Sequence, residues 1–212
     1  MPRVGVSSIR RRQTIEATIA AIHAHGYDAL TMARIASRAG MSAGLIAHYF
    51  GSKGELLAAT MRSLLTDLQA LVSRRLAEAG PAPRARIAAI VSANFDETQS
   101  TPQIVAAWLA FWGQVPHEPA LRRLQRVYSR RLESNLRREL GRMGLGEAER
   151  ARLAECVASL IDGIWMRAAL SDGDLDAPAA RRLVLETLDL HLAARGIGTA
   201  IVTENEKKRK SA

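Results

Sequence analysis

The sequence predicts an all-α protein, with a small N-terminal unit of three helices followed by a larger C-terminal helical domain. Apolar residues recur at intervals of three and four along most of the 212 residues, which is the spacing of one helix face. Glycine and proline interrupt this spacing at intervals that suit ordinary helix lengths. No segment alternates apolar and polar residues and no internal repeat is present, so strands and solenoids are not expected.

The first helix is expected to begin after Ser7 or Ser8 as its cap and to end at about His25. Its inner face is predicted to carry Ile9, Ile15, Ile19 and Ile22. Its first turn carries Arg10, Arg11 and Arg12. Cations there oppose the helix macrodipole by about 0.3–1 kcal/mol each, so an anion is expected nearby. DNA phosphate would supply that anion, and a flexible solvated arm is an equally good interpretation.

Residues 31–50 have the pattern of two short helices joined by a tight turn. Thr31 and Ser42 suit the two N-caps, and Gly40 suits a turn position with positive φ. Helical spacing on both sides of the turn is kept by Ile35, Ala36, Ala39, Leu45, Ile46 and Tyr49. This is a helix-turn-helix pattern, whose second helix would enter a DNA major groove. An ordinary helical hairpin without a ligand is the alternative.

The same stretch contains the pattern G-x-S-x-G at residues 40–44, which is also the nucleophile elbow of serine hydrolases. That elbow needs a β-strand before the serine, whereas the residues before Ser42 have helical spacing. No Asp and His partners follow in a recognisable order. We therefore expect Ser42 to cap a helix, and we expect no catalytic residues.

The net charge of +9 is concentrated near this motif. Residues 1–62 carry eight Lys and Arg against three Asp and Glu, whereas residues 63–202 are nearly balanced at eighteen against sixteen. A basic surface binds polyanions through release of condensed counterions, although it can also serve solubility alone. Residues 196–212 include the run Lys-Lys-Arg-Lys and are expected to form a disordered basic tail.

A long helix is predicted from 52 to 79. Ser52 and Glu55 form an S-x-x-E capping box at its start, and Gly80 and Pro81 end it. At 1.5 Å per residue it spans about 40 Å, enough to link the helix-turn-helix to the next domain. Five further helices are predicted at 84–98, 102–114, 118–141, 147–171 and 177–194. The last two have broad apolar surfaces, which predict a four-helix interface in a homodimer, with buried core helices as the alternative.

The aromatic residues predict a pocket in the C-terminal domain. Trp108 and Trp112 are one helical turn apart, and Trp165 lies three residues after Asp162 on another helix. Aromatic faces with a carboxylate suit a quaternary ammonium ion, because ring faces attract the cation by about 0.5–2 kcal/mol per contact and its nitrogen has no N–H to satisfy. The candidate effector residues are Asn94, Phe95, Asp96, Trp108, Phe111, Trp112, Tyr128, Asp162 and Trp165.

Two features of this pocket stay open from the sequence. Asp162 lies among apolar neighbours, so we expect a cationic partner for it, either a ligand or Arg167. Asn94 or Tyr128 could hydrogen-bond a ligand hydroxyl. For any single tryptophan, filling a helical core is the alternative, and the pattern alone does not identify the ligand.

Other classes of site are not expected. Cys156 is the only cysteine, which excludes disulfides within the chain and cysteine-based zinc sites, and its apolar neighbours suggest that it is buried. The five histidines are scattered and do not form a metal set. No stretch of about 20 apolar residues could span a bilayer, and the Arg-rich start lacks the apolar run of a signal peptide. We therefore expect a cytoplasmic protein with no cofactor and no membrane partner.

The first third of the chain resembles the TetR family of bacterial transcriptional repressors. The resemblance rests on Ala39-Gly40-Met41-Ser42 in the turn, on the pair Tyr49-Phe50, and on Ser52-Lys53-Gly54-Glu55-Leu56 at the start of the long helix. It implies a TetR-type fold with a DNA-binding domain at 8–68 and a ligand-binding and dimerisation domain at 69–195. It also implies a homodimer that binds double-stranded operator DNA.

Matching positions imply roles for individual residues of the motif. Ser42, Tyr49 and Lys53 should bind phosphates, and Thr31 should contact the DNA backbone. The residues implied to face base edges are Ala43, Gly44, Ala47 and His48. The family commonly has tyrosine where this chain has Ala47, which removes one contact and gives His48 a larger share in reading the bases.

Four further segments resemble choline-responsive members of that family, which control glycine betaine synthesis genes: 8–13, 94–99, 107–112 and 160–165. This implies a repressor of choline transport and glycine betaine synthesis genes that choline releases from its operator. Bound choline would tilt the long helix and change the spacing of two recognition helices, which read half-sites about one helical turn apart. Two alternatives remain, a repressor that senses another lipophilic or quaternary cation and, more distantly, a small helical enzyme.

Overall fold

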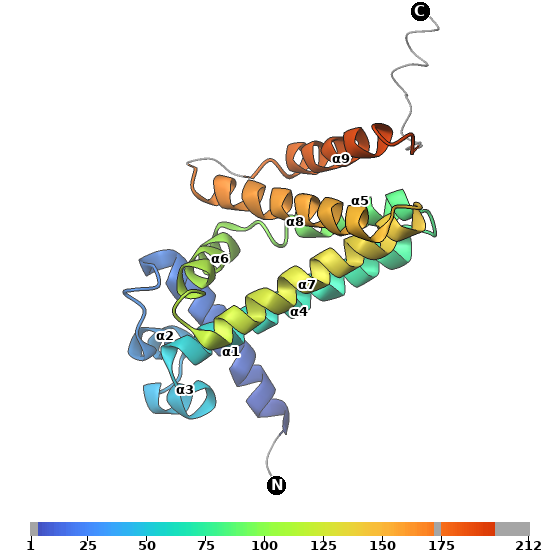
Figure 1. Cartoon of the computed structure of the whole chain (residues 1–212). Helices are drawn as coiled ribbons and strands as arrows, with labels where there is room; N and C mark the ends of the chain where they lie inside the picture. The colour runs from blue at the N-terminus through green and yellow to red at the C-terminus, as the bar shows by residue number, and fades with distance from the viewer. Residues whose placement is uncertain (1–3, 172–174, 198–212) are drawn as a thin grey trace, which may run out of the picture.

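The computed structural model describes residues 4–171 and 175–197, which form helices joined by short turns (Figure 1). No strand occurs among them, so the predicted all-α fold class is confirmed. In chain order the helices are α1 Val4–His25, α2 Met32–Ala39, α3 Ala43–Phe50, α4 Lys53–Glu78, α5 Pro83–Asn94, α6 Pro102–Gln114, α7 Pro119–Arg142, α8 Glu147–Ala169 and α9 Ala177–Ala193. Residues 198–212, the larger part of the predicted basic tail, lie outside the described residues.

The helices divide between a small head and a larger body (Figure 1). Helices α1, α2 and α3 form the head, from which α4 and α7 run side by side toward the opposite end of the molecule. In the body, α8 packs on α7, α9 contacts α5 and α8, and α6 contacts both α1 and α8. Helix α4 belongs to both parts, because it contacts α3 in the head and α5 and α7 in the body.

Side-chain caps determine where the helices of the head begin. The Oγ1 atom of Thr31 accepts a hydrogen bond from the backbone N–H of Arg34 at 3.2 Å. The Oγ atom of Ser42 accepts one from the N–H of Leu45, also at 3.2 Å. Between the two helices Gly40 has a φ of 63°, a left-handed conformation that glycine adopts without steric cost. The predicted caps and turn of the helix-turn-helix are therefore confirmed.

Helix α4 begins with the predicted capping box. The Oγ atom of Ser52 accepts a hydrogen bond from the N–H of Glu55, and the carboxylate of Glu55 accepts one from the N–H of Ser52. The helix has 26 residues, so at 1.5 Å per residue it is about 39 Å long. It is the longest helix of those described, and it links the head to the body.

One continuous hydrophobic core runs from the head into the body. Ile35 and Ile46 are fully buried in the head, Leu57 and Met61 continue the core along α4, and Phe111 is fully buried in α6. Packed protein interiors transmit displacements because they contain few voids. A movement in the body can therefore reach the head through this core.

Helix α1 begins at Val4, earlier than predicted, so Ser7 and Ser8 are not its caps. Ile9, predicted to face inward, is 59% exposed. The N-terminal part of α1 extends beyond the rest of the head (Figure 1). Helical periodicity identifies the apolar face but not where the helix leaves the core, which explains the error.

Helix α5 ends at Asn94, four residues before the predicted end at 98. The Oδ1 atom of Asp96 accepts hydrogen bonds from the backbone N–H of Thr98 at 3.1 Å and from its hydroxyl at 2.7 Å. An aspartate that binds the backbone two residues ahead favours a turn over a helix. Asp96 therefore lies in a turn and not on one helix with Asn94.

The apolar surfaces of α8 and α9 are divided between the core and solvent. Their buried aliphatic residues include Leu153, Val157, Ile161, Val184, Leu188 and Leu192. Four others are between 42% and 73% exposed: Met166, Leu170, Leu183 and Leu190. Cys156, predicted to be buried, is exposed, because the buried stripe of α8 passes beside it.

Candidate DNA-binding surface and effector cavity

The outward face of α3 carries mostly small side chains. Its exposed residues, with the N-cap, are Ser42, Ala43, Gly44, Ala47 and His48. Ile46 and Phe50 are buried and anchor the opposite face of α3 in the core. The imidazole of His48 is the only large polar group on the exposed face of α3, and its ring lies edge-on to that of Tyr49. Thr31, at the start of α2, is also exposed.

Helix α1 carries three consecutive arginines, one of which reaches the end of α3. Arg10, Arg11 and Arg12 are exposed. The guanidinium carbon of Arg11 lies 4.9 Å from the ring centroid of Phe50, the last residue of α3, so a cation–π contact links the two helices. Arg12 forms an ion pair with Glu16 at 2.9 Å, but both side chains are largely exposed and the pair contributes little to stability. Arg11 therefore places a cationic group at the end of α3.

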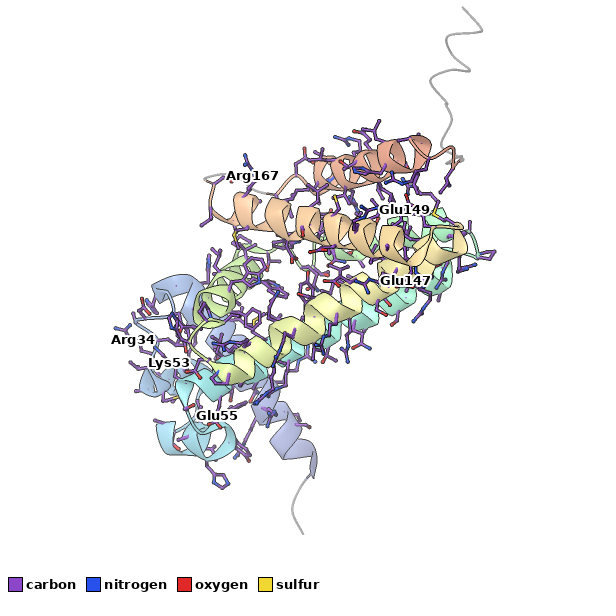
Figure 2. The ribbon with its side chains drawn as sticks, in the orientation of Figure 1. Arg34, Lys53, Glu55, Glu147, Glu149 and Arg167 are labelled. Carbon is purple, nitrogen blue, oxygen red and sulfur yellow. The ribbon has the colours of Figure 1, made fainter. Side chains whose placement is uncertain are left out.

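Lys53 connects the start of α4 to the head (Figure 2). Its Nζ donates a hydrogen bond to the backbone oxygen of Tyr27 at 3.1 Å and lies 4.3 Å from the Tyr27 ring centroid. Burial raises the pKa of Tyr27, and the charges of Glu118 and Asp28 add to that rise. An ammonium group has three N–H donors, so Lys53 retains donors for a phosphate.

A small cavity in the body brings six of the predicted effector residues together. It has a volume of about 20 Å³ and is lined by Leu68, Asn94, Gln99, Trp108, Trp112, Tyr128, Asp162 and Trp165. The ring centroid of Trp108 lies 5.4 Å from that of Trp112 and 5.5 Å from that of Tyr128. We call this space the aromatic cavity. It is narrow because its rings pack against one another.

Asp162 supplies the carboxylate of the aromatic cavity. Its Oδ1 accepts a hydrogen bond of 2.9 Å from the hydroxyl of Tyr128. Burial raises the pKa of Asp162, and the hydrogen bond from Tyr128 opposes that rise. Burial also raises the pKa of Tyr128 well above 10.0, with a further contribution from the charge of Asp162. Tyr128 is therefore a neutral donor, and among the described residues no cationic side chain is paired with Asp162.

Hydrogen bonds to the backbone hold two walls of this cavity. The indole Nε1 of Trp165 donates to the backbone oxygen of Asn94 at 2.9 Å, and the Nδ2 of Asn94 donates to the oxygen of Ile90 at 2.9 Å. Because the Trp165 N–H is already satisfied, that residue can offer its ring face to a cation. Asn94 retains its side-chain oxygen as an acceptor.

Known families match both parts of the chain. Residues 15–60 match the bacterial regulatory proteins of the tetR family, and residues 83–193 match the C-terminal domain of BetI-type transcriptional repressors. The HTH-type transcriptional regulator BetI of Burkholderia mallei is 49% identical over 195 residues, which are 92% of this chain and 100% of that protein. The chain belongs to the TetR family. With its BetI-type C-terminal domain it is a DNA-binding transcriptional repressor and not an enzyme.

Solved structures of other transcriptional regulators share the fold. A chain described as a transcriptional regulator from Pseudomonas aeruginosa PAO1 has a TM-score of 0.78 and 26% identity, over 90% of this chain and 95% of that one. Another, described as a transcriptional regulator from Saccharomonospora viridis in complex with choline, has a TM-score of 0.68 and 21% identity, over 87% and 97%. The second likeness concerns the fold alone.

Neither a membrane-spanning helix nor a metal-binding cluster occurs in the part of this TetR-family chain that the structure describes. None of its helices has the length and apolar character needed to cross a membrane. Its His, Cys, Asp and Glu side chains form no group of three that could hold a metal ion. Ser42 follows a helix and caps the next one, so its G-x-S-x-G pattern lacks the strand of a nucleophile elbow.

Three predicted effector residues lie outside the lining of the aromatic cavity. Phe95 and Phe111 are fully buried in the core, and the ring of Phe111 packs edge-on against Trp108 at 5.8 Å. Asp96 forms an ion pair with Arg75 at 2.9 Å. Burial acts to raise the pKa of Asp96, but hydrogen bonds from Thr98 and Arg75 lower it overall. Its charge is therefore already compensated.

Arg167 is not the partner of Asp162, contrary to one of the two expectations. It is exposed near the C-terminal end of α8 (Figure 2). Five residues along an α-helix correspond to a rotation of about 140°, which separates the directions of the two side chains. The partner is Tyr128 of α7, which the sequence pattern associated only with a ligand hydroxyl.

Gln99 lines the aromatic cavity and was not predicted. It is only 7% exposed, and its side-chain amide forms no hydrogen bond with the described residues. An amide without a protein partner is available to a ligand. Gln99 lies in the turn after α5, where helical periodicity gives no direction. The only signal for it was its place at the end of the segment 94–99.

Proposed function

We propose that this repressor controls genes for choline transport and glycine betaine synthesis, and that choline releases it from its operator. The observation that carries the proposal is the carboxylate of Asp162, which lies among aromatic rings with the neutral hydroxyl of Tyr128 as its partner. A buried carboxylate without a cationic neighbour is costly. A quaternary ammonium ion offsets that cost and is attracted to the ring faces.

Polar groups of the aromatic cavity suit the other end of choline. Gln99 and Asn94 are buried residues, and both line the same space as the rings. A hydroxyl group both donates and accepts a hydrogen bond, so it can satisfy either group. A site that hydrogen-bonds a ligand hydroxyl discriminates against analogues that lack it.

The size of the aromatic cavity links choline binding to a change of shape. A volume of 20 Å³ is enough for about one water molecule. A trimethylammonium group is larger, so the rings of Trp108 and Trp112 on α6 must move away from Tyr128 on α7. Binding would therefore separate these two helices.

The turn between α6 and α7 gives this movement a route to the head. It ends at Glu118, whose carboxylate lies beside the first turn of α4, and a Cβ atom added to Gly54 would be 3.0 Å from its Oε1. The adjacent residue Lys53 holds Tyr27. A displacement of Glu118 would therefore press on the start of α4, directly after the recognition helix α3.

We further propose a homodimer formed through α8 and α9. Met166 on α8, Leu170 directly after it, and Leu183 and Leu190 on α9 leave apolar surface exposed. The DNA-binding domain is 8–68 and the ligand-binding domain is 69–195. Two α3 helices in the dimer would read half-sites about 34–36 Å apart, and a tilt of α4 would change that spacing. A protein with this partner acts in the cytoplasm, where the bacterial chromosome lies.

The proposed DNA contacts follow the exposed surface of the head. Thr31, Ser42, Tyr49 and Lys53 would hold phosphates, and the arginines of α1 would add cationic contacts beside α3. The groups proposed to face base edges are Ala43, Gly44, Ala47 and His48. Because three of these four residues have no side-chain donor or acceptor, His48 and the shape of the groove would carry much of the specificity.

The test is a titration of operator binding with choline. The operator is isolated by pull-down of genomic fragments, and its affinity is measured by fluorescence anisotropy at fixed salt, with choline from zero to saturation. Saturating choline should weaken operator binding about tenfold or more. Trp112→Ala, which removes a half-buried ring, should require roughly tenfold more choline for the same release. An operator affinity that saturating choline leaves unchanged would show the proposal to be wrong.

A second candidate effector is another lipophilic cation, because aromatic faces attract any diffuse positive charge. A ligand that binds only the folded state raises the melting temperature in proportion to its affinity. A thermal-shift comparison of choline, betaine aldehyde and a cationic dye separates the candidates. A larger shift with the dye than with choline at equal concentration would favour the second.

A further inference from the structure

A second, larger cavity adjoins the aromatic cavity. It has a volume of about 280 Å³ and lies between α4, α5 and α7. Leu68, Asn94 and Tyr128 line both spaces. These three side chains therefore form the partition between the aromatic cavity and this one, which we call the outer cavity.

The outer cavity has an apolar floor and a basic rim. Buried Ile90 and Leu132 lie at its floor, and the exposed side chains of Arg131 and Arg138 lie at its rim. Arg131 donates a hydrogen bond to the neutral side-chain oxygen of Gln69 at 2.5 Å. Within the described part of the chain, neither guanidinium is paired with a carboxylate, and no acidic residue lines this cavity. The outer cavity is therefore positive, whereas Asp162 makes the aromatic cavity negative.

We propose that the outer cavity binds the anionic end of zwitterionic quaternary ammonium compounds, whose cationic end lies in the aromatic cavity. The inference rests on the proposed function, because it uses the same aromatic site. Opposite charges on the two sides of one partition match a ligand that carries a cation and an anion a few bonds apart. Choline itself has only the cationic end.

The register of α7 indicates which arginine such a ligand meets. Arg131 and Arg138 follow Tyr128 by three and ten residues, which places them about 4.5 Å and 15 Å further along the helix axis. A phosphate a few bonds from the quaternary nitrogen reaches the Arg131 end of the cavity. A guanidinium presents paired N–H donors that match phosphate and carboxylate oxygens, and the amide of Asn135 lines the same wall.

The test compares choline with phosphocholine, which adds a phosphate to the same cation. Both are titrated calorimetrically into the full-length protein and into variants of α7. Arg131→Gln should weaken phosphocholine binding about tenfold and change choline binding less than about twofold. Arg138→Gln should have a smaller effect, because it lies further from the partition. Arg130→Gln removes the same charge from an exposed position outside the cavity and should leave both affinities unchanged.

The outcomes separate this inference from the proposed function. If choline binds, and phosphocholine either fails to bind or has equal affinity for the wild-type protein and Arg131→Gln, the anionic subsite is refuted and the choline site stands. If neither compound binds the wild-type protein, both proposals fail. All three arginines are exposed, so the variants should fold, and matching melting temperatures check this.

Discussion

The recognition face of α3 and the aromatic cavity differ in how far they are prepared for their ligands. The outward residues of α3 are exposed on a helix that Ser42 caps and that Ile46 and Phe50 anchor, so under the proposal this face would need no rearrangement to meet DNA. The aromatic cavity has room for about one water molecule, because its rings lie 5.4–5.5 Å apart. One site is open and preformed, and the other must be opened.

This difference indicates which state the fold favours. A ligand shifts an equilibrium only by its differential affinity for two states. On the proposed function, DNA would bind the conformation described here, whereas a trimethylammonium group would require another conformation of α6 and α7. Choline and DNA would therefore select different conformations, which is the basis of release.

The largest predicted effect on operator binding comes from Ala47→Glu, on the exposed face of α3. Ala47 is exposed on α3, and a carboxylate there would face DNA phosphates. Like charges brought together at an interface cost several kcal/mol, so operator affinity should fall about a hundredfold while choline affinity is unchanged. Ala85→Glu makes the same change at an exposed position of α5 and should affect neither. Anisotropy measurements that find wild-type operator affinity in Ala47→Glu would exclude α3 as the recognition helix.

Asp162→Asn tests whether the negative charge of the aromatic cavity contributes to choline binding. Asparagine keeps the shape and the acceptor for Tyr128 but removes the charge, so choline affinity should fall roughly thirtyfold with operator affinity retained. Asp67→Asn, at an exposed position of α4, is the matched control. If calorimetry finds the same choline affinity in Asp162→Asn as in the wild type, the Asp162 carboxylate is not part of the choline site.

The same carboxylate predicts a dependence on pH. Burial raises its pKa above 3.8, so the folded protein holds this proton more tightly than the unfolded chain does. Its contribution to stability is therefore fully present at low pH and is lost as pH rises from 3.8 through the raised pKa of the folded protein. Asp162→Asn should melt a few degrees higher than wild type near neutral pH, and the difference should shrink in acid.

On the proposed function, choline would bind the ionised form of Asp162, so wild-type choline affinity should fall as pH is lowered through that pKa, while the weak affinity of Asp162→Asn stays level. Melting curves and calorimetry across the acid range measure both effects. Equal melting temperatures of the two proteins at neutral pH would contradict the assignment of Asp162 as a largely buried charge without a cationic partner.

Gly54→Ala tests whether the contact between Glu118 and the start of α4 couples the aromatic cavity to the recognition helix α3. The added methyl would lie 3.0 Å from the Oε1 of Glu118, so that carboxylate must shift. Choline affinity of the free protein should be unchanged, whereas the factor by which choline weakens operator binding should change roughly threefold. Gly113→Ala adds the same methyl to α6 with nothing within 4 Å and is the control. Identical coupling factors in the two variants would show that the contact between Glu118 and Gly54 does not transmit the effect of choline to α3.

The smallest predicted effect concerns the arginines beside the open face. Arg11→Gln should weaken operator binding roughly threefold and lower the slope of log affinity against log salt by about one, if one phosphate contact is lost. Arg74→Gln, at an exposed position of α4 in the body, should leave the slope unchanged. An unchanged slope in Arg11→Gln would favour the solvated arm that the sequence left as an alternative.

The head was predictable from local chemistry to a greater degree than the cavity. Thr31, Ser42 and Ser52 were predicted as caps and are caps, because capping depends on residues only a few positions apart. Ile9 shows the limit of this logic, since periodicity defines an apolar face but does not show whether another helix covers it.

Membership of the cavity depends on how distant helices pack. Trp108 and Trp112 could be placed together because they are one turn apart on α6. Phe111, from the same segment, turns into the core instead. The pair Tyr128 and Asp162 joins residues 34 positions apart on different helices. No local pattern encodes that pairing.

The central claim is that DNA at α3 and choline in the aromatic cavity favour different conformations. Reciprocal binding measurements test it most directly. Choline affinity is measured by calorimetry with and without saturating operator DNA, and operator affinity by anisotropy with and without saturating choline. Linkage requires the two ratios to be equal, and we predict a factor of about ten or more in each. Equal choline affinities for the free and the DNA-bound protein would contradict the account.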